Sequence, residues 1–168
     1  MKVLAIDPAF NSIGWVFMVD GELISRGCLH PPKPNAKAGK MEDDFRRAAA
    51  LCRELNFTVR FYNPDKVCLE LPGGCKSSRA ARMLGMATAL VAAVTNEAQS
   101  DTHLVSPFAV KRHTGLSSKA DIIKWALARQ PKLFDGVLKR SDNEHIADAY
   151  AVYEVWRDRA VSDMRGTS

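Results

Sequence analysis

Four consecutive apolar residues, Val3 to Ile6, begin the chain and run directly into an acidic residue, Asp7. This continuous apolar character is typical of a strand that is buried on both faces, because a half-exposed strand alternates apolar and polar residues. A second apolar run, Val67 to Leu69, ends in the same way at Glu70. The chain must therefore form a sheet covered on both sides, with an acid at the end of each of two inner strands.

Turn signals and helical periodicity divide the rest of the chain into further elements. Asp20 and Gly21 are a two-residue hairpin signal between strands expected over 14–19 and 22–26. Apolar spacing predicts helices over 43–57, 78–98 and 118–129, a short strand over 103–106, and a last helix that follows a capping-box pattern at 141–144. The order βββαβαβαα predicts an α/β fold with a mixed five-stranded sheet and helices on both faces.

The helix expected over 43–57 has a predicted buried face and a predicted exposed face. Charged residues such as Arg46 and Arg47 fall mostly opposite its apolar positions, so we expect them to face solvent. The positions expected to be buried are Phe45, Ala48, Ala49, Cys52 and Leu55.

The length of 168 residues suits a single domain over 1–168, without an internal repeat or interdomain linker. Three prolines and three lysines between His30 and Lys40 predict a basic mobile loop over 30–40, and a disordered tail is expected over 161–168. No stretch reaches the ~18 to 20 uncharged apolar residues that span a bilayer, and the first residues do not resemble a signal peptide. We expect an intracellular protein, cytoplasmic in a bacterial or phage-infected cell or else organellar.

Cysteine spacing and net charge bear on metals and partners. Cys28, Cys52, Cys68 and Cys75 lack CxxC spacing, which favours free thiols over a zinc site. The net charge of +5 suggests a polyanionic partner without proving one.

Four residues with metal-ligand side chains are predicted to meet at one place. The carboxyl ends of two parallel strands joined by a crossover lie at the same sheet edge, so Asp7 and Glu70 can be neighbours. His145 and Asp148 share one face of the last helix because they are three residues apart. Three carboxylates and an imidazole repel unless a cation holds them, and hard oxygen ligands favour Mg²⁺ or Mn²⁺. Two such ions per active site would suit metal-assisted phosphodiester hydrolysis.

Each of these residues also has a purely structural interpretation. An Asp that ends a strand is commonly a turn residue, and a single His is often a hydrogen-bonded core residue. Glu70 and Asp148 are harder to explain in this way, because each is a carboxylate among apolar neighbours and needs a partner there.

Several segments spread over nearly the whole chain together carry a resemblance to a known family. They include Leu4 to Pro8 with Gly14-Trp15, Gly27-Cys28, Leu69-Glu70, Leu84 to Ala87, Val110-Lys111 with Lys119, and His145 to Ala151. With these segments the chain resembles the RuvC-type Holliday junction resolvases of the ribonuclease H-like superfamily. The resemblance implies a homodimer, joined through the 78–98 helix, that grips a four-way DNA junction and nicks two strands symmetrically.

The resemblance also assigns roles to single residues. Asp7, Glu70, His145 and Asp148 become the metal site, and Lys119 and Lys111 are placed near the scissile phosphate. Where an aromatic residue often follows the strand-end glutamate in that family, this chain has Leu71 to Cys75, so we assign no stacking wedge. The full set of expected DNA contacts is Lys111, Lys119, Lys33, Lys37, Lys40, Lys76 and Arg79.

Three alternatives stay open at this point. One is a broader branched-DNA or flap endonuclease on the same fold, because metal ligands report the chemistry and not the shape of the DNA. A second is a non-catalytic junction-binding module. The third is an actin-like or sugar-kinase ATPase, suggested by residues 7–14, although such proteins need two domains of this kind.

Overall fold

One mixed sheet lies at the centre of the structure, a computed structural model that describes residues 1–71, 73–74, 77–116, 118–136 and 139–166. Its strand order is β3-β2-β1-β4-β5. The inner strand β1 pairs antiparallel with β2 and parallel with β4; β3 and β5 form the edges. The predicted α/β fold with a five-stranded mixed sheet is confirmed. The strands are β1 Lys2–Asp7, β2 Ile13–Val19, β3 Glu22–Leu29, β4 Lys66–Glu70 and β5 Asp101–Val105.

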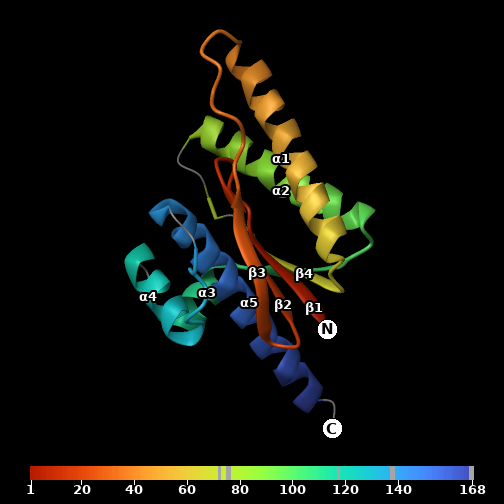
Figure 1. Ribbon diagram of the computed structural model, residues 1–168, viewed down its shortest axis with the longest axis vertical. Helices are drawn as coiled ribbons and strands as arrows, with labels where there is room; N and C mark the ends of the chain where they lie inside the picture. The colour runs from red at the N-terminus through yellow and green to blue at the C-terminus, as the bar shows by residue number, and fades with distance from the viewer. Residues whose placement is uncertain (72, 75–76, 117, 137–138, 167–168) are drawn as a thin grey trace.

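Helices cover both faces of this sheet, as the apolar run of β1 predicts (Figure 1). Successive residues of β1 point to opposite faces. Leu4 and Ile6 pack in one core with residues of α1 and α2, whereas Val3 and Ala5 pack in the other with residues of α3, α4 and α5. The helices are α1 Lys40–Tyr62, α2 Ser78–Glu97, α3 Pro107–Thr114, α4 Lys119–Arg129 and α5 Arg140–Gly166.

The buried face of α1 agrees with the predicted one at Ala48 and Leu55 and differs from it at Phe45. Leu51, Leu55 and Val59 recur at i, i+4 and i+8 and are fully buried, whereas Phe45 lies outside this stripe and is 72% exposed. Arg47, expected to face solvent, is buried because its guanidinium donates to Asn11 Oδ1 at 2.9 Å and to the carbonyl of Pro32 at 3.2 Å. These hydrogen bonds offset the cost of removing a charge from water.

Helix α3 was not predicted from the sequence. Ser106 caps it, because its hydroxyl accepts from the N–H of Ala109 at 3.2 Å, and Pro107 occupies the first turn. Both are start signals for a helix, but eight residues are too few for a clear apolar period. Lys111 therefore lies on a helix, and β5 begins earlier than expected, at Asp101.

Helix α5 extends beyond both of its predicted ends. It begins at Arg140, so 141–144 form its first turn and do not precede it as a capping box. It continues to Gly166, so the expected disordered tail over 161–168 is wrong through residue 166. Neither α5 nor any other helix in the described ranges combines the length and the apolar character that crossing a membrane requires.

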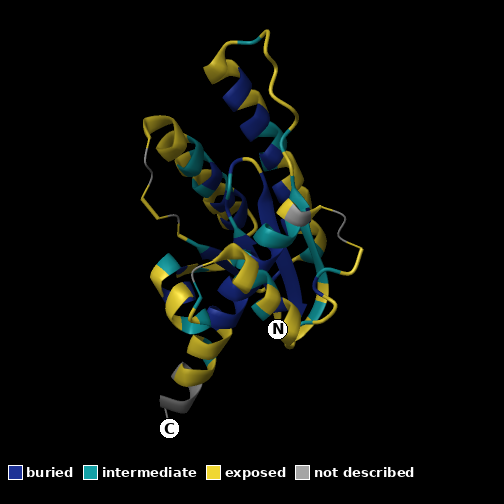
Figure 2. Cartoon of the chain, turned by 90° about the vertical axis from the view of Figure 1, so that its left-hand side faces the viewer, coloured by how far each residue is buried: buried dark blue, intermediate teal, exposed yellow. Residues whose placement is uncertain are grey.

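The segment between β3 and α1 lies at the same end of the molecule as the carboxyl ends of β1 and β4 (Figure 1). It is irregular and mostly exposed, in contrast to the buried strands (Figure 2). Two contacts hold it to α1: Asp43 accepts from the N–H of Asn35 at 3.2 Å, and Arg46 donates to the carbonyl of Lys33 at 2.8 Å. A loop over 30–39 is confirmed; its mobility stays a prediction.

Candidate active site

Two acidic side chains end the paired strands β1 and β4. The parallel register matches Ile6 with Leu69, so the next residues, Asp7 and Glu70, leave the sheet at the same edge. Both line a cavity of about 270 Å³ whose other walls are Pro8, Ala9, Gly73, Gly74 and Leu84. The prediction that the two strand-end acids meet is confirmed.

Helix α5 adds an imidazole and a third carboxylate. His145 Nδ1 lies 2.7 Å from Asp7 Oδ2, although the two residues are 138 positions apart in the sequence. Asp148 follows three residues later on the same helix, and its charge and that of Asp7 act on each other. The structure thus brings together the four residues that the sequence predicts as metal ligands.

A glycine allows α5 to lie this close to the sheet. Gly14 on β2 is the register partner of Asp7. A Cβ at Gly14 would lie 2.2 Å from the carbonyl oxygen of His145 and 2.6 Å from its Cβ, which is far inside van der Waals contact. Only a residue without a side chain fits here, and the close approach sets the position of His145.

The carboxylates destabilise one another's charge. Burial raises the pKa of Glu70 to about 7, with a further rise from the charges of Asp7 and Asp148. Burial and the charge of Asp7 raise the pKa of Asp148 to about 6. Acids with raised pKa values are common at functional sites. Buried neighbouring carboxylates cost stability when they have no partner, so a purely structural role does not account for them.

His145 pairs with Asp7 in the cluster. The hydrogen bond with Asp7 raises the pKa of His145 above the ordinary value for histidine, although burial acts in the opposite direction. Without a metal ion, this bond therefore favours the protonated form of the ring. With a metal ion, the same bond would orient the two side chains, as carboxylate–histidine pairs do around bound metals.

Two lysines lie within electrostatic range of the carboxylates. Lys119, the first residue of α4, donates to Glu144 Oε2 at 2.8 Å, and this bond raises its pKa; Asp148 and Asp7 raise it further. The charge of Lys111 on α3 acts on Glu70 and opposes the rise in its pKa. Both lysines predicted near the scissile phosphate thus face the acidic cluster.

The other predicted DNA contacts lie outside this cluster. Arg79 is on α2, where its guanidinium lies 3.5 Å from Asp44, a buried acid that Arg82 also contacts at 2.7 Å. Lys33, Lys37 and Lys40 are exposed along the 30–39 loop and the start of α1. Lys76 lies outside the described residues.

Sequence reasoning missed two positioning residues. Gly14 appears only as part of a resembling segment, since nothing in the sequence shows that α5 crosses β2 there. Glu144 was interpreted as the end of a capping box, whereas the structure pairs it with Lys119. A pattern that is correct in composition can therefore be wrong in position when the helix begins earlier than the pattern indicates.

The donor set fits hard divalent cations. Asp7, Glu70 and Asp148 offer carboxylate oxygens, which Mg²⁺ and Mn²⁺ prefer, and His145 adds a nitrogen that suits Mn²⁺ better than Mg²⁺. Burial and the neighbouring negative charges raise the pKa values of Glu70 and Asp148. A bound cation would act in the opposite direction, because its positive charge favours the ionised carboxylates.

No protein-family model and no curated protein sequence matches the chain, but solved structures do. Thermus thermophilus RuvC in complex with a Holliday junction substrate superposes with a TM-score of 0.69 at 18% identity, covering 90% of this chain and 89% of that one. The yeast mitochondrial Holliday junction resolvase Ydc2 superposes with a TM-score of 0.64 at 14% sequence identity, covering 92% of this chain and 76% of that one. Fowlpox virus resolvase in complex with Holliday junction DNA superposes with a TM-score of 0.61 at 13% sequence identity, covering 95% of this chain and 99% of that one. The chain therefore has the RuvC-type, ribonuclease H-like fold.

The contact at Gly14 yields the first prediction. Gly14→Ala places a methyl group against the backbone of His145 and forces α5 away from the sheet, at a cost of roughly 1 to 3 kcal/mol in the free energy of unfolding. A shift of the helix by about 1 Å would lower any metal-dependent activity by about a hundredfold. Urea unfolding and an activity assay measure the two effects.

Gly85→Ala is the matched control for the unfolding measurement, because within the chain a Cβ at Gly85 on α2 meets nothing within 4 Å. That variant should be more stable by about 1 kcal/mol, as alanine is in helices. Equal stability and activity of Gly14→Ala and the wild type would contradict the proposed role of the contact.

The raised pKa values yield the second prediction. In the metal-free protein Glu70 and Asp148 bind protons more tightly when folded than when unfolded, so their contribution to stability is largest below their ordinary values of 4.5 and 3.8. It is lost as pH rises through about 6 and 7. Thermal unfolding without metal should show Glu70→Gln melting above the wild type at pH 8 and close to it at pH 4.

Added Mn²⁺ should reverse this order at pH 8, because an ion that binds only the folded wild-type site stabilises it. Glu22→Gln, at an exposed position of β3, is the control and should follow the wild type throughout. A wild type that melts at the same temperature at pH 4 and pH 8 without metal, and gains nothing from Mn²⁺, would show that the acids do not form a strained cluster.

Proposed function

We propose that the protein is a metal-dependent endonuclease that resolves four-way DNA junctions by paired, symmetric nicks. The observation that carries the proposal is the convergence of Asp7, Glu70, His145 and Asp148 at one sheet edge. The RuvC-type fold supports it, since the compared structures with this fold are Holliday junction resolvases, two of them with junction DNA. The three acids provide the donor set for divalent ions that phosphodiester hydrolysis needs.

Each member of the cluster has a definite part in this proposal. Asp7, Glu70 and Asp148 would hold the ions, with His145 as a further ligand. Bound ions supply charge that stabilises the attacking and leaving oxygens of an in-line displacement. The hydrogen bond from His145 fixes the carboxylate of Asp7, and Gly14 fixes the helix that carries His145.

The basic residues suit a DNA substrate. Lys119 stays protonated beside the cluster because of Glu144, so it can contact a phosphate near the reacting bond. The charge of Lys111 acts on Glu70. The 30–39 loop lies at the same end of the molecule (Figure 1). Its exposed lysines would contact the phosphates of a DNA arm. A purely structural, non-catalytic module does not explain acids kept together at this cost.

A homodimer through α2 is part of the proposal, and its basis is the exposed face of that helix. The apolar residues Ala87, Val91 and Val94 are buried within the chain's own core, and Leu90 packs there too. The outer face of α2 instead exposes small residues at helical spacing, which let a second helix approach closely: Ala81, Gly85, Ala89 and Ala92.

The third prediction tests the activity. Asp7→Asn keeps the shape of the side chain but removes the charge that holds a cation, so nicking of a labelled four-way junction with Mg²⁺ or Mn²⁺ should fall by about a hundredfold or more. Junction binding, measured by gel shift, should stay within a few-fold of the wild type. Asp20→Asn, an exposed turn residue, is the matched control.

Linear duplex, three-way and flap substrates run in parallel separate junction resolution from a broader nuclease activity. Equal rates on flaps and four-way junctions would favour the broader branched-DNA nuclease. Metal-independent nicking, or an Asp7→Asn protein as active as the wild type, would overturn the proposal.

The fourth prediction tests the dimer. Ala89→Arg places a large charge on the exposed face of α2 without disturbing the core, so the folded protein should become monomeric by light scattering. Paired nicks should fall sharply while single nicks persist, because one site cannot make two cuts on opposing strands. Ala128→Arg on α4 is the matched control at an exposed alanine. A wild type that is monomeric both alone and on a four-way junction would contradict the dimer.

A further inference from the structure

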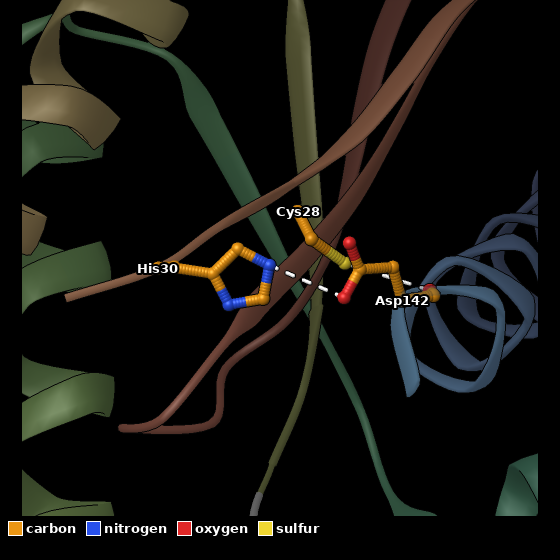
Figure 3. Close-up of side chains that lie close together, drawn as sticks. All are labelled: Cys28, His30 and Asp142. Atoms are coloured by element: carbon orange, nitrogen blue, oxygen red, sulfur yellow. Dashed lines mark hydrogen bonds and ion pairs between the residues drawn. The ribbon is translucent and has the colours of Figure 1, made fainter. Parts of the chain in front are cut away.

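Three side chains with metal-ligand atoms converge at the junction of β3, the following loop and α5. Cys28 lies near the end of β3, His30 follows that strand, and Asp142 is in the first turn of α5. The sulfur of Cys28, a ring nitrogen of His30 and a carboxylate oxygen of Asp142 all lie within 4.8 Å of one another. Figure 3 shows the imidazole and the sulfur directed toward the Asp142 carboxylate.

This cluster is separate from the acidic cluster. The strand register places Asp7 beside Gly14 and Gly14 beside Cys28. Neighbouring strands are about 4.8 Å apart, so the backbones of Asp7 and Cys28 are roughly 10 Å apart across the sheet. Each site therefore has its own ligands, and they are linked through Asp142, which lies one helical turn before His145.

We propose that Cys28, His30 and Asp142 bind a zinc ion, with water as the fourth ligand. His30 Nε2 and Asp142 Oδ1 are 3.2 Å apart. Tetrahedral zinc with bonds of about 2.0 to 2.1 Å to nitrogen and oxygen holds these two atoms roughly 3.3 Å apart, so this pair needs almost no movement. The sulfur then turns from the Asp142 carbonyl, 3.5 Å away, toward the ion, and the thiol proton passes to solvent.

The donor atoms favour zinc over the ions expected at the acidic cluster. A thiolate and an imidazole are soft or intermediate ligands that suit Zn²⁺, whereas Mg²⁺ takes oxygen ligands almost exclusively. The first cluster contains three carboxylates and this one contains a single carboxylate. The two sites can therefore be loaded independently in the presence of excess Mg²⁺.

Zinc at this position would clamp the start of α5 to the edge strand β3. The ligands come from segments more than a hundred residues apart, since Cys28 and Asp142 are separated by 114 positions. Binding would stabilise the folded state and restrain the first turns of the helix that carries His145 and Asp148. The zinc site does not depend on nuclease activity, and its test does not measure cutting.

Cobalt is the probe, because Co²⁺ replaces Zn²⁺ and gives a sulfur-to-metal charge-transfer band when a thiolate binds it. The full chain is titrated with Co²⁺ in excess Mg²⁺, which occupies the acidic cluster. The band should saturate at one equivalent and disappear on addition of Zn²⁺. Cys28→Ser should abolish the band, whereas Cys52→Ser, the same change at another half-buried cysteine, should keep it.

Two further variants keep the test decisive if Cys28→Ser does not fold. His30→Ala removes a partly exposed side chain, and Asp142→Asn keeps the shape of the side chain. Each variant should weaken Co²⁺ binding at least tenfold while circular dichroism is unchanged. Asp7→Asn should leave the band intact, which separates this site from the proposed nuclease site. Absence of the band in the wild type, or its persistence in Cys28→Ser, would show that the three side chains form an ion pair and a hydrogen bond only.

Discussion

The mutual repulsion of Asp7, Glu70 and Asp148 is the constraint around which this fold is arranged. Each acid arrives on a different element, and burial together with the neighbouring charges raises the pKa of two of them. The protein offsets this with an imidazole on Asp7 and lysines on two helices. A divalent cation would offset the remaining free-energy cost of ionising these carboxylates. The same crowded negative charge therefore destabilises the metal-free site and attracts a metal ion.

Positioning of α5 turns this electrostatic constraint into a defined site. Gly14 admits the backbone of His145 where any side chain would collide with it. The helix then continues across the sheet, with Ile146, Ala149 and Val152 buried in one core. Gly14 at the contact, together with these apolar residues beyond it, holds α5 in one position against the sheet. The proposed zinc site would add a second restraint at the other side of the same first turns.

The sequence predicts the parts of this structure that depend on local patterns. Continuous apolar runs in β1 and β4 indicate inner strands, and their terminal acids indicate one sheet edge; both predictions are confirmed. Helix α3 was missed because eight residues carry too little periodicity. The buried face of α1 was predicted correctly at Ala48 and Leu55 but wrongly at Phe45, which lies outside the stripe that contains Leu51. The closeness of Cys28, His30 and Asp142 was beyond prediction, because it depends on where α5 begins and on which strand it crosses. For the same reason, missing CxxC spacing could not exclude a zinc site.

The most direct test of the central claim is a crystal structure with Mn²⁺ in which anomalous scattering locates the metal. Strong anomalous density is expected between the carboxylates of Asp7, Glu70 and Asp148, and it should be lost in crystals of Asp7→Asn. Manganese bound only elsewhere on the molecule, with these acids protonated or paired to lysines at neutral pH, would contradict the claim.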